Sequence, residues 1–277
     1  MGRLTARRKV IRVDLATGST SRSETAAVEE PLELRVDDAV LTVTMRTPGH
    51  DVELAHGLLR SEGVISDPDD VIAARYCTDT ETLNVLQVQL RTTAKTLPVS
   101  AQRSLASYGG CGLCGKSSID AVTGSAAFTR QAIVSEPATT FDVQRVAELP
   151  QLLRAGQPVF DRTGGTHAAG LFGRSGDAIV IREDIGRHNA VDKVTGWALM
   201  NRQATDETIL MVSSRASFEI VQKAAMAGIP VLACVSAPSS LAIDAAAEFG
   251  MTLVAFVRGT RMTVCTHPER LGLTFGA

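Results

Sequence analysis

The sequence is poor in aromatic residues and carries almost no net charge. Phe, Trp and Tyr make up 4% of the 277 residues, and 28 Lys and Arg against 30 Asp and Glu give a formal charge of −2. Nucleic-acid-binding proteins usually have a basic excess, and those that hold single strands stack the bases on aromatic side chains. The composition therefore argues against a nucleic-acid partner, while 44% hydrophobic residues are typical of a globular protein.

Long apolar runs are also missing. A membrane-spanning helix needs about 20 consecutive apolar residues, whereas the best runs, 229–235 and 251–257, have the length of strands. The basic N-terminus is not followed by the apolar segment of a secretory signal. We therefore expect a cytoplasmic protein with no membrane partner, whose five cysteines are reduced rather than paired in disulfides.

The residue pattern predicts an α/β protein with a strand-rich, α+β N-terminal domain (1–106), a mobile glycine-rich loop (107–120) and an α/β domain (121–277). In the last of these, helices and strands alternate from about residue 140, which is typical of a mostly parallel sheet between helices. The N-terminal strands are expected at 8–15, 32–36, 39–45 and 83–91, with one helix between Pro48 and Gly63. The later strands are expected at 177–182, 207–212, 229–235 and 251–257, and the helices at 142–154, 187–201, 217–227 and 239–249.

The clearest chemical motif is the pair Cys111 and Cys114 in the glycine-rich segment 107–117. Only a thiolate is a good sulfur nucleophile, and the neighbouring Lys116 favours that form. Four interpretations compete: half of a structural zinc site, a thioredoxin-like redox pair, an unreactive pair, and a sulfur relay in which one thiol carries a persulfide. The sulfur relay is favoured, because the other cysteines are scattered and the motif does not lie between a strand and a helix.

Hydroxylated and basic residues follow three consecutive predicted strands. If the sheet is parallel, these turns share its carboxyl edge, where α/β folds bind ligands and where helix N-termini attract anions. Serines at such positions often do no more than cap a helix, so capping stays open beside binding of a phosphate-bearing ligand. No Walker A motif or G-x-G-x-x-G fingerprint follows a strand. The candidate residues are Ser213, Ser214, Arg215 and Ser217, then Ser239, then Arg258, Thr260 and Arg261.

Two histidines form a third group of candidates. His167 and His188 could act as acids, bases or metal ligands, although a lone histidine is more often structural. The polar run from Asp184 to Lys193 around His188 suggests a lined pocket. His50 and His56 lie on different faces of their predicted helix, so we expect them to be structural and predict no metal site there.

Several long motifs resemble the formate dehydrogenase accessory sulfurtransferases, the FdhD family. They occur in order over most of the chain, from about residue 30 to 270. The motifs are RTPGHDVELAHGLLRSEGVI (46–65), GGCGLCGK (109–116), TGGTHAAGLF (163–172), REDIGRHNAVDK (182–193) and the long stretch 213–259. The resemblance implies a cytoplasmic sulfur carrier that takes persulfide sulfur from a cysteine desulfurase. It would deliver this sulfur to the bis-molybdopterin guanine dinucleotide molybdenum cofactor, which formate dehydrogenase requires.

The resemblance also implies roles for single residues. Cys111 would carry the persulfide, and Cys114 matches the second family cysteine. The guanine dinucleotide part of the cofactor would bind at Phe256, Val257, Arg258, Gly259, Thr260 and Arg261. It further implies a homodimer and a cytidine-deaminase-like C-terminal domain. Zinc deaminases use H-x-E followed by P-C-x-x-C, but here Ala169 stands in the place of the glutamate and no cysteine pair follows His167. We therefore expect the scaffold without deaminase chemistry.

Two functions from other classes stay open at this point. One is a non-catalytic molybdenum-cofactor chaperone that docks on apo-formate dehydrogenase, and the other is a zinc-binding regulatory module. Loading of sulfur by a desulfurase separates a carrier from a chaperone, and metal analysis decides the third possibility.

Overall fold

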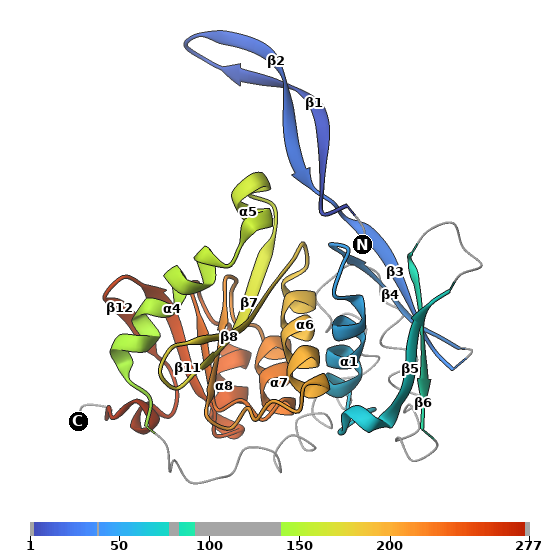
Figure 1. Cartoon of the computed structure of the whole chain (residues 1–277). Coiled ribbons are helices and arrows are strands. Elements are labelled where there is room, and N and C mark those ends of the chain that lie inside the picture. The colour runs from blue at the N-terminus through green and yellow to red at the C-terminus, as the bar shows by residue number, and fades with distance from the viewer. Residues whose placement is uncertain (1–2, 38, 78–82, 92–139, 275–277) are drawn as a thin grey trace.

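The computed structural model describes residues 3–37, 39–77, 83–91 and 140–274. The segment that contains Cys111 and Cys114, and with it the predicted boundary between the two domains, lies outside the described residues. Within them, the strands form three sheets of two, four and six strands (Figure 1). The α/β class is confirmed, and in the described part of the chain no helix combines the length and apolarity needed to cross a membrane.

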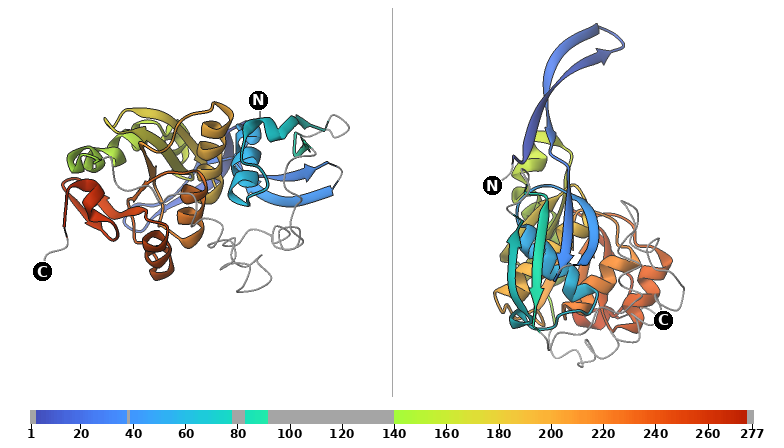
Figure 2. Two further views of the ribbon diagram at one scale, coloured as in Figure 1. Left: turned by 90° about the horizontal axis from the view of Figure 1, so that it is seen from below. Right: turned by 90° about the vertical axis from the view of Figure 1, so that its right-hand side faces the viewer.

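The first sheet is a hairpin that projects from the body of the molecule (Figures 1 and 2). Its strands are β1 (Thr5–Asp14) and β2 (Gly18–Ala27), which pair antiparallel along their whole length. Asp14 closes the turn by accepting hydrogen bonds from the backbone N–H groups of Ala16 and Thr17, and Gly18 adopts a φ of 96°. The sequence predicted the first strand and missed the second, which consists mostly of small and hydroxylated residues.

The four-stranded sheet has the order β4-β3-β6-β5 and is covered on one face by helix α1 (Asp51–Ser61). Its strands are β3 (Glu30–Val36), β4 (Ala39–Arg46), β5 (Val71–Tyr76) and β6 (Val85–Leu90), and the short helix η1 (Pro68–Asp70) precedes β5. Alternate residues such as Leu32, Leu34 and Leu86 point inward and pack against Leu54 and Leu59 of α1. Strand β5 was not predicted.

The six-stranded sheet has the order β12-β11-β10-β9-β7-β8. Its strands are β7 (His167–Gly173), β8 (Ala178–Asp184), β9 (Thr208–Val212), β10 (Val231–Cys234), β11 (Thr252–Arg258) and β12 (Arg261–Val264). Strands β9, β10 and β11 are parallel, as predicted, whereas β7, β8 and β12 pair antiparallel with their neighbours. The expectation of a mostly parallel sheet is therefore wrong for half of its strands. Strands β7 and β12 were not predicted, and β8, which was predicted, pairs antiparallel with β7.

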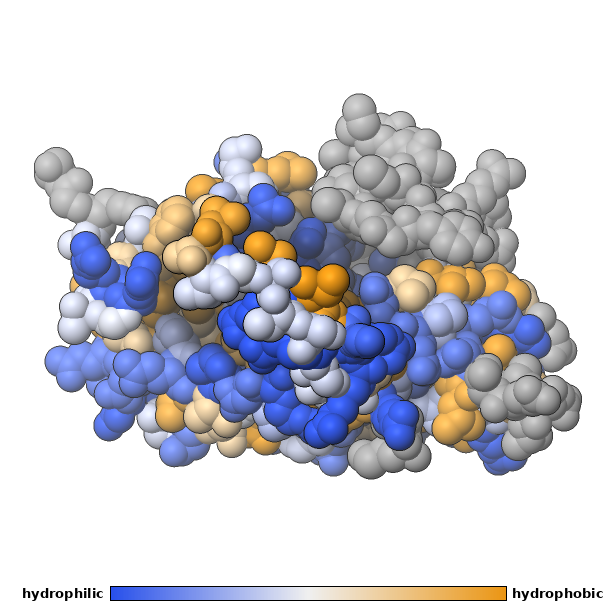
Figure 3. All heavy atoms as spheres, turned by 90° about the horizontal axis from the view of Figure 1, so that it is seen from above, coloured by the Kyte–Doolittle hydropathy of each residue, from blue (hydrophilic) through white to orange (hydrophobic). Residues whose placement is uncertain are grey.

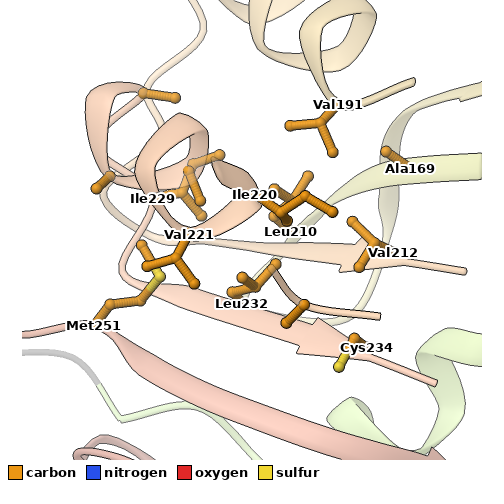
Figure 4. Close-up of a cluster of buried hydrophobic side chains, with 14 of the residues drawn as sticks. Ala169, Val191, Leu210, Val212, Ile220, Val221, Ile229, Leu232, Cys234 and Met251 are labelled. Carbon is orange, nitrogen blue, oxygen red and sulfur yellow. The ribbon is translucent and has the colours of Figure 1, made fainter. Parts of the chain in front are cut away.

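Helices cover both faces of this sheet. One face packs against α6 (Arg187–Met200), α7 (Phe218–Met226) and α8 (Ser240–Glu248), and the other packs against α4 (Val143–Ala155). Figure 4 shows the first of these cores, where Leu210 and Leu232 of the central strands meet Ile220 and Val221 of α7. Two short helices, α5 (Pro158–Thr163) and η3 (Pro268–Leu271), complete the described chain. All four helices predicted for this half are confirmed to within about two residues.

Helix α1 of the four-stranded part packs against helix α6 of the six-stranded part, and the two helices cross at two glycines. A Cβ atom on Gly57 would lie 1.9 Å from the carbonyl oxygen of Asp192, and one on Gly196 would lie 1.8 Å from the carbonyl oxygen of Glu53. No side chain fits at either place, so the two helix backbones touch directly. The sequence therefore needs glycine at both positions despite the cost of glycine to a helix.

Buried ion pairs surround this crossing. Lys193 Nζ lies 2.6 Å from Asp184 Oδ2 and donates to the carbonyl oxygen of Thr47 across the interface at 2.9 Å. Lys223 Nζ pairs with Asp192 at 2.7 Å and also donates to Ser61 at the end of α1. Burial raises the pKa of Asp192, and the nearby Lys223 ammonium opposes that shift. Because each buried charge has a partner, its desolvation is offset within the interface.

The glycine crossing gives the first prediction. Gly196→Ala should lower the free energy of unfolding by about 1–3 kcal/mol or more, because the new methyl group overlaps the backbone of α1. Without the clash, the same change in a helix would stabilise the protein by about 1 kcal/mol. Gly173→Ala is the matched control, since its nearest neighbouring atom would lie 3.9 Å away. Urea unfolding measures both, and equal midpoints for the two variants would contradict the tight crossing.

Candidate functional site

The turns after β9, β10 and β11 lie together at one edge of the six-stranded sheet, as predicted from the parallel strand order. The first two turns are joined by a parallel bridge between Ala216 and Pro238 and by a hydrogen bond from Ser239 N to Ala216 O. The third is joined to the second by a hydrogen bond from Phe256 N to Ser236 O. The predicted residues on these three segments therefore form one continuous edge.

Most of the serine hydroxyls at this edge already bond within the protein. Ser239 caps α8 by accepting a hydrogen bond from Ala242 N at 3.1 Å, so the simple capping interpretation holds there. Ser213 accepts from Ala168 N at 2.8 Å and links β9 to β7. Ser214 is buried and donates to the carbonyl oxygen of Arg215, whose own side chain is exposed. These serines shape the edge more than they present free donors to a ligand.

A shallow pocket of about 600 Å³ lies at the end of β11. Its walls include Phe256, Arg258, Thr260 and Arg261, four residues of the segment that the family resemblance singled out. The other two do not line the pocket with side chains: Val257 is buried in the core, and Gly259 forms the tight turn to β12 with a φ of 57°. The remaining walls come from Val143 at the start of α4 and from Met262 and Thr263 of β12, which the sequence did not suggest.

Phe256 has an unusual backbone conformation. Its φ is 53°, a region that a bulky residue rarely adopts, and it lies at an irregularity where the register of β11 against β12 shifts between Ala255 and Arg258. Half of its side chain is exposed. Strained residues of this kind cluster at ligand sites, and here the strain presents an aromatic ring beside the exposed guanidinium groups of Arg258 and Arg261. Arginine suits phosphate oxygens and an aromatic face suits a base.

The described chain resumes beside this pocket. Thr140, the first residue after the segment 92–139, lines a neighbouring hollow of about 630 Å³, and its carbonyl oxygen accepts a hydrogen bond from Arg174 Nε at 2.9 Å. Val143 lines both hollows. Thr140 therefore lies in the hollow that adjoins the pocket of Phe256 and the two arginines.

A second polar group lies at the same edge, near the start of α6. His188 Nε2 lies 2.8 Å from Glu219 Oε2 on α7 and 3.4 Å from Ser217 Oγ. His167, at the start of β7, lies close enough to His188 and Arg187 for their charges to act on it. Burial lowers the pKa of His167, and both neighbours lower it further. Glu219 could not be assigned from the sequence, because nothing in its helix marks it as a partner of His188.

Four other polar residues of this run, Asp184, Asn189, Asp192 and Lys193, do not line this group, and the expectation of a single lined pocket is wrong for them. Asp184, Asp192 and Lys193 are buried in the ion pairs beside α1, and Asn189 donates to the carbonyl oxygen of Met45 at 2.8 Å. These residues instead hold the N-terminal part of the molecule against the six-stranded part.

The two remaining histidine candidates bond to residues of their own helix. His56 is buried and bonds to the carbonyl oxygen of Val52 at 2.7 Å, and burial lowers its pKa. His50 contacts Glu53, which forms a close ion pair with Arg182. Within residues 3–37, 39–77, 83–91 and 140–274, no three His, Cys, Asp or Glu side chains are grouped so as to hold a metal ion.

Comparison with known proteins shows the family of the chain. A model of the FdhD/NarQ family matches residues 27–272, which is most of the chain. The chain belongs to the FdhD/NarQ family. Proteins named sulfur carrier protein FdhD are similar to it along nearly their whole length. That of Nocardia farcinica is 53% identical over 98% of this chain and 96% of its own, and that of Streptomyces coelicolor is 48% identical over 99% and 98%.

A solved structure shares the fold of this FdhD/NarQ family member. It is the crystal structure of a protein from Desulfotalea psychrophila assigned as a formate dehydrogenase accessory protein, with a TM-score of 0.76 and 24% identity. The alignment covers 97% of this chain and all of that one. The family resemblance that the sequence motifs predicted is therefore confirmed.

Thiol reactivity gives the second prediction. Burial raises the pKa of the Cys234 thiol to about 11, so very little of it is thiolate at pH 8. Iodoacetamide should label Cys234 in the native protein at least about 100-fold more slowly than in the urea-unfolded protein, because its pKa is about two units high and its sulfur is inaccessible. Peptide mapping of a time course measures the rates. Equal rates in the native and unfolded protein would contradict the buried assignment.

Proposed function

We propose that this protein is a sulfurtransferase that accepts persulfide sulfur from a cysteine desulfurase on Cys111. It passes this sulfur to the bis-molybdopterin guanine dinucleotide molybdenum cofactor, which becomes usable by formate dehydrogenase. The cofactor is the substrate that receives sulfur and not a resident group. The observation that carries the proposal is the pocket at the end of β11, because Phe256, Arg258 and Arg261 offer in one place what a guanine nucleotide needs.

The chemistry of the pocket fits a nucleotide tail in two ways. Two guanidinium groups at Arg258 and Arg261 can bind the oxygens of a diphosphate. The exposed ring of Phe256 gives a purine base a face for stacking, and its backbone has the kind of strain that clusters at ligand sites. Arg215 adds positive charge farther along the same edge.

The sulfur step is assigned to the two cysteines of the glycine-rich segment. The desulfurase leaves a persulfide on Cys111. The Cys114 thiolate then attacks the inner sulfur, which forms a Cys111–Cys114 disulfide and expels hydrosulfide toward molybdenum. A cellular dithiol reductant restores both thiols. The support for this order is the two-residue spacing, which puts the two sulfurs within reach of each other.

The proposal treats the six-stranded part of the molecule as a cytidine-deaminase-like scaffold without deaminase chemistry. Deamination needs a glutamate two residues after the zinc-binding histidine, and Ala169 in that place is buried and has no carboxylate. The alternative function is a non-catalytic cofactor chaperone, which would use the same pocket and leave the cysteines unloaded.

Nucleotide binding gives the third prediction. Arg258→Ala and Arg261→Ala should each weaken GDP binding by about 1.5–3 kcal/mol, roughly 10- to 150-fold, because each loses a charge-assisted hydrogen bond. Arg145→Ala removes the same charge from the exposed side of α4, where it pairs with Glu148, and should leave the affinity unchanged. Titration calorimetry measures all four proteins. No heat with GDP, or equal affinity in all variants, would contradict the site.

Sulfur loading gives the fourth prediction. After incubation with a cysteine desulfurase and cysteine, the wild type should gain reducible sulfur on Cys111, as measured by intact mass and peptide mapping. Cys111→Ser should gain none there and should not support formate dehydrogenase maturation.

Cys114→Ser is the matched variant for this experiment. It should load Cys111 but deliver the sulfur slowly, whereas the wild type should accumulate the disulfide when reductant is absent. Loading of neither cysteine in the wild type would favour the chaperone. Delivery by Cys114→Ser at the wild-type rate would remove the release role from Cys114.

A further inference from the structure

His188 and Glu219 form an ion pair at the edge of the six-stranded sheet. His188 is the second residue of α6, and Glu219 is the second residue of α7. The distance from His188 Nε2 to Glu219 Oε2 is 2.8 Å, and the two side chains are 21% and 8% exposed. The carboxylate is therefore shielded from water, while part of the imidazole ring stays open to it.

This contact uses one of the two ring nitrogens of His188. Ser217 Oγ lies 3.4 Å from the same Nε2, so the three residues are not a Ser–His–acid triad, in which the hydroxyl and the carboxylate bond to opposite nitrogens. Among the residues that the structure describes, none forms a hydrogen bond with Nδ1. When the ring is protonated, Nδ1 therefore has an N–H that it can give to another molecule.

The neighbouring histidine does not suit the same role. Burial lowers the pKa of His167, and the charges of Arg187 and His188 lower it further. The His167 ring is therefore mostly neutral at pH 7, and it has no proton to give there. Of these two histidines at the edge, His188 is the better acid.

Glu219 is the carboxylate that serves His188. Asp184 and Asp192 are also close enough to the two histidines for their charges to act on them. Each of these aspartates, however, is buried against a lysine. Glu219 is the acidic residue whose oxygen lies within hydrogen-bond distance of the His188 ring, and it gives the protonated ring a partner.

The pair lies along the same edge as the nucleotide pocket. Helix α7 begins after β9 and the pocket lies at the end of β11, so two strand spacings, about 10 Å, separate the two turns. An extended dinucleotide is longer than this. Within the described sheet only β12 lies beyond β11, so a ligand held at the pocket reaches more of the edge by extending toward β9 and α6. Figure 3 views the molecule from this side, and hydrophilic residues cover much of the surface there.

Release of hydrosulfide needs a proton. In the proposed step the Cys114 thiolate attacks the inner sulfur of an anionic persulfide, and the outer sulfur would leave as S²⁻, which is a very poor leaving group. If an acid protonates the outer sulfur, this sulfur leaves as HS⁻ with the electron pair of the broken S–S bond. One thiolate, one anionic persulfide and one proton then give one disulfide and one hydrosulfide.

We propose that His188 is the catalytic acid that protonates the outer persulfide sulfur as it leaves, and that Glu219 positions the ring for this transfer. Nδ1 gives the proton, and the ring is left with its remaining proton on Nε2, where the Glu219 carboxylate accepts it. Water returns a proton to the ring through its exposed part. The inference rests on the proposed function, because it names the acid for the release step of that function.

A single-turnover measurement of sulfide release tests the acid. The full-length protein is loaded by a cysteine desulfurase and freed of it, and the sulfide that appears is followed colorimetrically. His188→Gln should load as the wild type does and release sulfide about 100-fold more slowly, which is the scale of general acid catalysis. Glu219→Gln should slow release at least five-fold. Added imidazole should restore part of the rate in His188→Ala, which a purely structural histidine would not allow.

His267→Asn is the matched control. His267 also pairs with a glutamate, Glu269, at 3.0 Å, but it lies at the opposite end of β11, where its carbonyl oxygen accepts from Thr252. Asparagine also suits its φ of 47°. This variant should release sulfide at the wild-type rate. All variants should keep GDP affinity within about two-fold and a urea midpoint near that of the wild type.

The outcomes separate this inference from the function on which it rests. A wild type that gains no sulfur would overturn the proposed function and this inference with it. A wild type that loads and releases sulfide, beside His188→Gln that releases it equally fast, would overturn this inference alone. Loss of release in His188→Ala with no response to imidazole would likewise overturn the acid role.

NMR of ¹⁵N-histidine-labelled protein tests the positioning by Glu219 without any turnover. In the wild type at a pH where the ring is neutral, His188 should carry its proton on Nε2, because the carboxylate accepts there. Glu219→Gln should shift the ring toward a mixture of both tautomers, since an amide can donate as well as accept. A wild-type ring with its proton on Nδ1, or no change in Glu219→Gln, would remove the positioning role from Glu219.

Discussion

The contact on which the rest of the molecule depends is the crossing of α1 and α6 at Gly57 and Gly196. Because no side chain separates the two backbones there, Lys193 can reach the carbonyl oxygen of Thr47. Lys223 can likewise reach both Asp192 and Ser61. Apolar side chains could stabilise such an interface equally well. Paired buried charges accept fewer alternative orientations, so we infer that they fix how the four-stranded part sits on the six-stranded part. The same crossing holds the first turn of α6, and with it His188, at the edge of the sheet.

The sequence predicted those elements whose residues repeat with a clear period. The helices from α4 onward and the parallel strands β9, β10 and β11 belong to this group, because each has a continuous apolar stripe or run. Strand β7 was missed because His167–Gly173 contains mainly small residues, which pack well between neighbouring strands but give no β-branched signal. Strand β2 was missed because it is exposed and rich in serine. Sequence alone also could not tell that β8 runs antiparallel, since its direction is set by β7.

The candidate site could be predicted in part for a similar reason. Parallel neighbouring strands must end at one edge, so the residues after β9, β10 and β11 were expected to lie together. What those residues do there depends on neighbours that are distant in the chain. Asp184 looked like part of a pocket, and Lys193 converts it into half of a buried ion pair. Ser213 looked like a phosphate ligand, and its hydroxyl instead binds Ala168 N of the unpredicted strand β7.

The irregularity in β11 connects the core to the pocket. Leu253 and Ala255 pack toward α7 and α8, and Val254 packs toward α4. In a regular strand, residue 256 would follow Val254 toward α4 and residue 257 would turn away. The extra residue shifts this alternation by one, so Val257 takes the core position and Phe256 is left outside with a positive φ. The burial of Val257 therefore holds the ring of Phe256 at the pocket. A strand anchored in the core positions the ring more precisely than a loop would, so a ligand that stacked on it would need little further ordering of the ring.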